Sequence, residues 1–227
     1  MTPSDTAADT AAVRGEGLTH SYRTAGRSLT ALHDVTISAA SGRVTALVGP
    51  SGSGKSTLLR MLACLERPDE GRVEVGGTEV TALSARARRA VRRKRIGYVF
   101  QNPVDNLLDY LTVREHLELA AKMRGTGPVG TELLDRLGLD HRAGHRPRQL
   151  SGGEQQRTAL AFAAVGSPAA VLADEPTAQL DRASARLVAD AFRALAGAGQ
   201  TVVVATHDPL LMAAVDDTVE LVDGRIR

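Results

Sequence analysis

The chain has 227 residues, 43% of them hydrophobic, which is enough to bury the core of one large domain or of a domain with a subdomain attached. Its 28 Lys and Arg residues nearly balance its 26 Asp and Glu residues, so the net charge of +2 is weak support for a polyanionic partner. The single cysteine, Cys64, excludes an intramolecular disulfide framework and fits a reducing compartment.

The N-terminal segment predicts a disordered tail over residues 1–12, with the folded domain at 13–227. The tail has neither the basic start nor the continuous apolar stretch of a secretory signal. Residues 13 to about 40 show short alternating patterns, which favour antiparallel strands. The longest weakly polar run, 159–173, is shorter than the roughly 20 residues that cross a bilayer. Any membrane role is therefore expected to come through a partner.

The strongest motif follows the apolar run 43–48 and opens a helical pattern. The sequence GPSGSGKST matches G-x-x-x-x-G-K-[ST], in which glycines let backbone N–H groups close around phosphate oxygens. The Lys55 charge adds about 4 kcal/mol at about 4 Å and an effective dielectric near ~20. Ser56 is expected to offer its hydroxyl to Mg²⁺, and Thr57 to contact a phosphate. The alternative is a glycine-rich turn without a ligand. The predicted nucleotide-binding residues of this loop are Gly49, Pro50, Ser51, Gly52, Ser53, Gly54, Lys55, Ser56 and Thr57.

Three segments follow the first helix. Residues 71–80 show a short alternating pattern with glycine turns and predict more antiparallel strand. Residues 86–95, RARRAVRRKR, carry seven basic side chains and predict a solvated helix face. The alternative for this run is an electrostatic contact with anionic lipid or an acidic partner loop. Residues 96–100 form an apolar run and predict a buried strand.

Residues 102 to about 165 predict a helical subdomain. Thr112 and Glu115 have the spacing of a capping box for a helix that runs to Gly125, and Pro128 is expected to open a second helical stretch. His141 and His145 lie four residues apart, but Gly144 and Pro147 interrupt a helix there and no third ligand is evident. A metal site at this histidine pair is therefore not expected.

The sequence LSGGEQQR, residues 150–157, predicts a helix that begins at a second capping box. Ser151 is a favourable N-cap, and Glu154 lies three residues on. Gly152 and Gly153 leave the helix start bare, so its N–H groups and partial positive charge can receive a phosphate. The alternative is an ordinary helix start without a ligand.

The apolar run 169–173 ends in two adjacent carboxylates. Because side chains alternate along a strand, Asp174 and Glu175 must diverge and can take different roles. Asp174 fits a partner of Mg²⁺, and Glu175 fits the group that orients and polarises an attacking water. A strand that simply ends in an acidic turn is the alternative.

The remaining runs complete an α/β pattern. Residues 182–199 form an amphipathic helix that ends in glycine, and residues 201–206 and 217–222 form further apolar runs. Five runs without polar alternation indicate strands covered on both faces. The predicted fold is therefore α/β, with a mostly parallel core sheet, a small antiparallel β subdomain and a helical subdomain.

These motifs together resemble the nucleotide-binding subunit of ATP-binding cassette (ABC) transporters, from about Gly17 to Arg227. The segment 49–57 is similar to that family's phosphate loop, 150–157 to its signature sequence, and 171–177 to its magnesium and catalytic strand. The resemblance implies a P-loop ATPase of the ABC type, with ATP and Mg²⁺ as its ligands.

The resemblance also implies roles for single residues. Tyr22, 27 residues before Gly49, corresponds to the aromatic residue that stacks on adenine. Asp181 corresponds to a residue at the dimer contact. The implied catalytic residues are Lys55, Gln101, Glu175 and His207, and the implied metal ligands are Ser56, Gln101 and Asp174. Gln101 would sense the nucleotide and touch the permease side, and His207 would contact the terminal phosphate.

In the family, the signature helix of one subunit covers the ATP held by the phosphate loop of the other. The resemblance therefore implies a head-to-tail dimer around two ATP, formed as a homodimer or with a paralogous ATPase subunit. It further implies a separate membrane permease that holds the ATPase in the cytoplasm, on the inner face of the cell membrane. A second hypothesis is a signalling ATPase whose membrane partner regulates an extracytoplasmic enzyme.

A third hypothesis, a DNA-repair or chromosome-organising ATPase, is disfavoured. Such proteins place a long coiled coil between the phosphate loop and the signature, whereas only about 93 residues lie between Thr57 and Ser151. The chain also has no nucleic-acid-binding signature, so no nucleic-acid partner is expected.

Within the family, the chain looks most like the branch of lipoprotein release, macrolide-type export and cell-division signalling. It departs from that branch at Asp109, at His116 and at Ala178-Gln179. The first two positions are expected to face the permease, so they weaken any transfer of substrate. The third is at the expected dimer contact and leaves the nucleotide chemistry intact.

Overall fold

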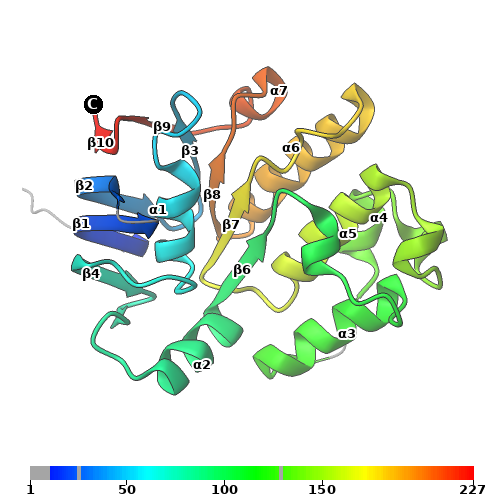
Figure 1. Cartoon of the computed structure of the whole chain (residues 1–227). Coiled ribbons are helices and arrows are strands. Elements are labelled where there is room, and N and C mark those ends of the chain that lie inside the picture. The colour runs from blue at the N-terminus through cyan, green and yellow to red at the C-terminus, as the bar shows by residue number, and fades with distance from the viewer. Residues whose placement is uncertain (1–10, 25–26, 128–129) are drawn as a thin grey trace, which may run out of the picture.

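Two sheets and the helices around them form the part of the chain that the computed structural model describes, which is residues 11–24, 27–127 and 130–227 (Figure 1). The six-stranded sheet has the order β10-β9-β3-β8-β7-β6. Its strands from β9 to β6 pair in parallel, and β10 adds an antiparallel edge. The bounds are Val44–Val48 for β3, Ile96–Val99 for β6, Ala170–Asp174 for β7, Thr201–Ala205 for β8, Asp217–Val222 for β9 and Arg225–Ile226 for β10.

Strands β3, β6, β7 and β8 are covered on both faces, as their unbroken apolar sequences predict, whereas in β9 the same prediction is wrong because Thr218 and Glu220 are exposed. In β8, Val202 and Val204 pack into one buried cluster with residues of helices α5 (Gly152–Ala164) and α6 (Arg182–Gly197). Val203 and Ala205 pack into a second cluster with residues of helix α1 (Lys55–Leu62) and of the other sheet. One buried cluster thus packs on each face of the sheet. Because the strands are parallel, their carboxyl ends meet at one edge.

The second sheet is antiparallel, in the order β2-β1-β4-β5. Its strands are β1 (Ala11–Thr24), β2 (Arg27–Ala40), β4 (Glu70–Val75) and β5 (Thr78–Glu79). Of the expected tail 1–12, residues 1–10 lie outside the described residues. Ala11 and Ala12 belong to β1, because Ala11 pairs with Ala40 and the N–H of Gly76 donates to the carbonyl of Ala12.

All elements between β6 and β7 are helical in the described residues, as the sequence predicts for 102–165. They are η1 (Pro103–Asn106), α3 (Val113–Arg124), α4 (Glu132–Arg136), η2 (Asp140–Arg142), η3 (Pro147–Gln149) and α5. The capping box of Thr112 and Glu115 is confirmed, and Gly125 ends α3 in the left-handed conformation. The second helix is α4, which begins only at Glu132 after the N-cap Thr131, while Pro128 lies outside the described residues.

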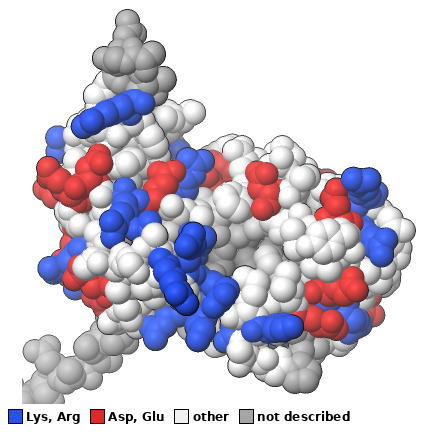
Figure 2. Space-filling view, turned by 60° about the horizontal axis from the view of Figure 1, so that its bottom comes forward, with Lys and Arg blue, Asp and Glu red and all other residues white. Residues whose placement is uncertain are grey.

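Helix α2 (Ala85–Arg95) connects the antiparallel sheet to β6 and contains the basic run. The Ser84 hydroxyl accepts a hydrogen bond from the N–H of Ala87 and caps the helix. None of its side chains is buried, so the helix is a projecting ridge. Figure 2, in which the bottom of Figure 1 comes forward, shows blue side chains gathered at this place.

The last helix, α7 (Pro209–Met212), lies between β8 and β9. No helix in the described ranges combines the length and the apolar composition that crossing a membrane requires. This agrees with the sequence, where every apolar run is short.

Candidate functional site

The phosphate loop begins directly after β3 and ends in α1. Gly49, Gly52 and Gly54 have φ angles of 142°, 78° and 103°, which strain any residue with a side chain. Space excludes a side chain as well: a Cβ on Gly49 would lie 2.0 Å from the Leu221 carbonyl oxygen, and one on Gly54 would lie 2.5 Å from that of Ala31. The backbone can therefore take this curved path only with glycine at these positions.

Lys55 is the first residue of α1 and folds back over the loop. Its ammonium donates hydrogen bonds to the carbonyl oxygens of Gly49, at 2.8 Å, and Pro50, at 2.9 Å. An ammonium has three donors and a full charge, so this position puts a cation at the mouth of the loop where N–H groups of the helix start also point. The loop is thus arranged to receive an anion.

A cavity of about 740 Å³ brings most of the expected site residues together. Its lining contains the whole phosphate loop and residues from five other parts of the chain. They are Tyr22, Leu29, Ala31, residues 49–57, Gln101, Asp174, Glu175, Ala178 and His207. Because Asp174 ends β7, and Gln101 and His207 follow β6 and β8 closely, the parallel sheet itself positions these polar groups.

The two adjacent carboxylates have different partners. Asp174 is buried and accepts a hydrogen bond of 3.0 Å from the Ser56 hydroxyl. Glu175 lies 3.1 Å from Nδ1 of His207. The two side chains therefore diverge, as alternation along a strand predicts, and each meets a residue of a different motif.

Glu175 also has an unusual backbone. Its φ angle is 45°, in the left-handed region that residues with side chains rarely adopt. Its N–H donates to the carbonyl of Ala205, which helps to hold the turn that follows β7. The carboxylate lies at the cavity wall, where 18% of the Glu175 side chain is exposed against 83% for His207.

Tyr22 lies on β1 and lines the same cavity as Asp174 and Glu175. Its hydroxyl donates to Oε2 of Glu66 at 2.7 Å and lies 3.3 Å from the Thr57 hydroxyl. The His20 ring meets the Tyr22 ring edge to face, at 4.9 Å between centroids. Burial raises the pKa of Tyr22, so its hydroxyl remains a donor at neutral pH.

Two residues near Tyr22, Glu66 and Leu29, are not predicted from the sequence. Glu66 comes from the loop after α1, and only the folded chain brings it to Tyr22. Leu29 pairs with Tyr22 across β1 and β2, lines the cavity and is 71% exposed. The alternation in residues 13 to about 40 predicts antiparallel strands but not which of their faces lines a cavity.

The second predicted phosphate-binding group, the N-terminus of α5, has its own set of hydrogen bonds. The Ser151 hydroxyl accepts from the N–H of Glu154, and the Glu154 carboxylate accepts from the N–H of Ser151, which confirms the capping box. Arg142 donates to the same carboxylate at 2.8 Å. The bond from the Ser151 backbone, together with Arg142, lowers the pKa of Glu154 to about 2.

This helix start does not contribute to the cavity. In the described part of the chain, the lining of the cavity includes none of Ser151, Gly152, Gly153, Glu154 and Asp181. Gly152 faces open space, because a Cβ there would meet no atom within 4 Å. Asp181 is exposed and caps α6 by accepting from the N–H of Ser184. The expected site residues thus fall into two groups.

Comparison with known proteins decides the family. The profile of the ABC transporter family matches residues 32–178. The chain belongs to this family. It is 42% identical over 215 residues to the lipoprotein-releasing system ATP-binding protein LolD 1 of Rhodopirellula baltica, covering 92% of this chain and 93% of that protein.

Two further relatives extend this result. The ABC chain is 41% identical to the macrolide export ATP-binding/permease protein MacB 1/2 of Paracoccus denitrificans, covering 94% of this chain and 32% of that longer protein. Its structure matches a dimeric, post-hydrolysis state of the ATP-binding cassette MJ0796 bound to ADP and Pi. That match has a TM-score of 0.86 and 34% identity, and it covers 95% of this chain and 96% of the other.

The ABC chain is therefore an ATPase that binds ATP, of the LolD and MacB type. The predicted family, fold class and enzymatic activity are confirmed. The roles of the individual residues within this ATPase remain predictions.

One departure from the branch has a structural explanation. His116 was expected in a region that faces a permease, but its side chain is fully buried. Its Nε2 accepts from the N–H of Leu108, so its Nδ1 must carry the proton that it donates to the Thr112 carbonyl at 2.7 Å. Burial lowers the pKa of this histidine, and the ring remains neutral. His116 therefore shapes the segment before α3 from inside.

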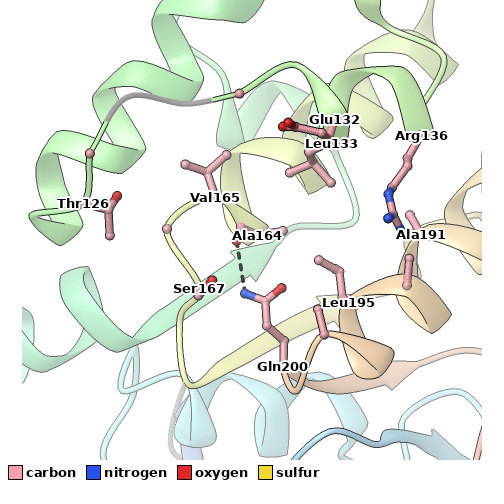
Figure 3. A pocket seen from close by; sticks show the side chains of 15 residues that line it. Thr126, Glu132, Leu133, Arg136, Ala164, Val165, Ser167, Ala191, Leu195 and Gln200 are labelled. Carbon is pink, nitrogen blue, oxygen red and sulfur yellow. Dashed lines mark hydrogen bonds between the residues drawn. The ribbon is translucent and has the colours of Figure 1, made fainter.

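The ABC ATPase has another cavity, of about 600 Å³, that shares no residue with the nucleotide-site lining (Figure 3). Leu133, Val165 and Leu195 supply apolar surface, and the Gln200 amide donates to the Ala164 carbonyl at 3.2 Å. Its lining includes residues of α5 and α6, but none of the predicted nucleotide-binding, catalytic or metal-binding residues.

Proposed function

We propose that this protein is the ATP-hydrolysing subunit of an ABC transporter, dimerising head to tail around two ATP and driving a separate membrane permease. The observation that carries the proposal is the division of the site residues into two groups. One group lines the 740 Å³ cavity, whereas Ser151 and its helix start lie outside that lining with a bare N-terminus. A helix start of this kind can receive a phosphate held by a second subunit.

In this proposal, the phosphate loop binds the triphosphate. The backbone N–H groups of residues 51–57 surround the phosphates, and Lys55 leaves the two loop carbonyls to pair with the terminal phosphate oxygens. Tyr22 stacks on the adenine ring, and Leu29, opposite it, adds apolar surface beside the base.

Glu175 then orients and polarises the attacking water. Its carboxylate lies at the cavity wall, and His207, 3.1 Å away, fixes its direction and can bond the terminal phosphate. Gln101 completes the wall on the side of β6. The bond from the Glu175 N–H to the Ala205 carbonyl and the contact with His207 hold the carboxylate there before ATP binds, so little reorganisation is needed at the moment of reaction.

Mg²⁺ fits the residues present. Ser56 and Asp174 place a hydroxyl and a carboxylate oxygen 3.0 Å apart beside the phosphate loop, and Gln101 adds an amide oxygen. Mg²⁺ prefers such oxygen donors and usually completes its shell with substrate phosphates and water. When bound, it would neutralise charge on the phosphates.

The proposed contact with the permease is the segment after Gln101. Val104, Leu108 and Tyr110 are large apolar side chains that are 56%, 38% and 67% exposed. Exposed apolar residues this close in sequence are typical of an interaction surface. Asp109 lies among them and pairs with Arg148, so the surface carries charge as well. Through this contact the protein would lie in the cytoplasm, on the inner face of the membrane.

The test of this function is to isolate the native membrane complex, identify the protein that copurifies, and reconstitute both in vesicles. ATP-dependent movement of a substrate supports transport. ATP-dependent activity of an external hydrolase without movement would support the signalling alternative instead. ATP turnover that is independent of any membrane protein and of protein concentration would contradict both.

A prediction for the adenine end separates the Tyr22 ring from its hydroxyl. Tyr22→Leu is expected to weaken ATP binding roughly 5- to 150-fold, because stacking of a base on an aromatic ring contributes ~1–3 kcal/mol. Tyr22→Phe keeps the ring and loses only the bonds to Glu66 and Thr57, so it should stay close to the unaltered protein. Calorimetric titration with ATP measures both, and equal affinities for Leu and Phe would remove Tyr22 from base recognition.

A further inference from the structure

The nucleotide site and the proposed permease contact leave the basic helix α2 unexplained. The helix carries seven Lys and Arg side chains and no acidic one. Among the described residues, no ion pair includes a side chain of α2, although salt bridges form at several other arginines, such as Arg43, Arg60 and Arg142. The positive charge of α2 is therefore not neutralised by an ion pair within residues 11–24, 27–127 and 130–227.

The basic residues fall on two faces of the helix. Arg88, Arg92 and Arg95 share the inner side of the helix, where Arg88 is half-buried and Arg92 and Arg95 donate to the carbonyls of Cys64 and Gly76. Arg86, Arg89 and Arg93 are exposed and spaced by three and four residues, so they share the outer face. Lys94, also exposed, borders that face. The outer face is thus a row of guanidinium groups that the fold does not use.

This row is unfavourable for the isolated protein. Arg86–Arg89 and Arg89–Arg93 are like-charge pairs at helical contact spacing, which destabilise a helix. Arg86 also lies in the first turn, where the positive end of the helix dipole disfavours a cation, and that turn contains no acidic residue. An anionic surface in contact with the row would relieve both effects.

The form of the helix indicates what kind of anion fits. Since Arg86, Arg89 and Arg93 are exposed, the outer face of α2 is open to an extended anionic surface. It contains no aromatic residue on which a nucleic-acid base could stack. The planar guanidinium group of arginine can donate two parallel hydrogen bonds to phosphate oxygens. Mobile lipid headgroups can gather around a row of such exposed charges. Figure 2 shows these blue side chains adjoining one another on one face of the molecule.

We propose that the outer face of α2, formed by Arg86, Arg89 and Arg93, is a contact surface for an anionic phospholipid bilayer. The contact is electrostatic, because Ala90, the apolar residue that shares the outer face with these arginines, is too small to insert. The proposal does not rest on the transport function, since it concerns a direct contact of this chain with lipid rather than one made through a permease.

The test is cosedimentation of the full chain with vesicles of phosphatidylcholine alone and of phosphatidylcholine mixed with phosphatidylglycerol. Binding is expected only to the anionic vesicles, and it should weaken as salt shortens the screening length from about 10 Å at 0.1 M to about 3 Å at 1 M. The triple variant Arg86→Gln, Arg89→Gln, Arg93→Gln should lower the partition coefficient at least about tenfold.

The matched control is Arg136→Gln, Arg186→Gln, Arg225→Gln, which removes three exposed arginines from α4, α6 and β10 and changes the net charge equally. It should bind like the unaltered protein, and both variants should keep ATP hydrolysis. Equal losses in the two variants, or no binding of the unaltered protein to anionic vesicles, overturns the proposal. The proposal is also overturned if the protein does not bind lipid but copurifies in detergent with a membrane protein, and the triple variant loses that copurification. Such a result would assign α2 to a protein partner.

Discussion

Glu175→Gln is expected to retain ATP binding and to slow ATP hydrolysis by about 10²- to 10⁴-fold, the contribution of a positioned general base. The amide keeps the shape of the side chain and can still contact His207, which lies 3.1 Å from the carboxylate. It cannot accept a proton from water. The backbone strain at a φ of 45° is the same for Gln as for Glu, so the fold should not change.

Because hydrolysis would be the step that separates the two subunits, this variant should also accumulate an ATP-bound dimer. Phosphate release measures the rate, and size-exclusion chromatography with and without ATP measures the dimer. Lys55→Ala is the contrasting variant, because it removes a charge worth about 4 kcal/mol at an effective dielectric near ~20 and should weaken ATP binding itself. Normal turnover by the Gln variant would remove Glu175 from the chemistry.

The chemistry of the cavity could be predicted from the sequence because each motif is local. The glycines of residues 49–57 and the strand before Asp174 are contiguous segments whose spacing determines their geometry. The sheet then brings them together, since strands β3, β7 and β8 are neighbours and end at the same edge. The contact between Ser56 and Asp174, which are 118 residues apart, follows from that arrangement.

Other features of the site depend on packing that a sequence pattern does not encode. Glu66 reaches Tyr22 only because α1 returns the chain to the antiparallel sheet. His116 could not be placed inside rather than at the surface, because a histidine at that helical position suits either environment until Leu108 and Thr112 are positioned to bond it. Helix α4 likewise packs through the buried Leu134, a contact that its sequence pattern alone does not specify.

The division of the site residues leads to the second large effect. Ser151→Arg is expected to leave ATP binding to one subunit nearly unchanged and to abolish ATP-dependent dimerisation, with hydrolysis reduced to the level of the isolated subunit. Ser151 is outside the lining of the cavity, so a bulky cation there does not touch ATP in the same chain. In the proposed dimer, it would occupy the position where the helix start meets the phosphate of the partner. Titration with ATP and analytical ultracentrifugation measure the two properties separately.

The substitution also removes an N-cap, so the loss of the cap needs its own control. Ser151→Ala loses the hydroxyl that accepts from the N–H of Glu154 but adds no bulk. It should cost ~1 kcal/mol of unfolding free energy, which is about 2–4 °C in melting temperature for a chain of this size. Because the helix would still present its N–H groups, the Ala variant should dimerise with ATP. Dimerisation and ATPase activity that persist in the Arg variant would place all the groups needed for hydrolysis in a single chain, and the head-to-tail arrangement would then be wrong.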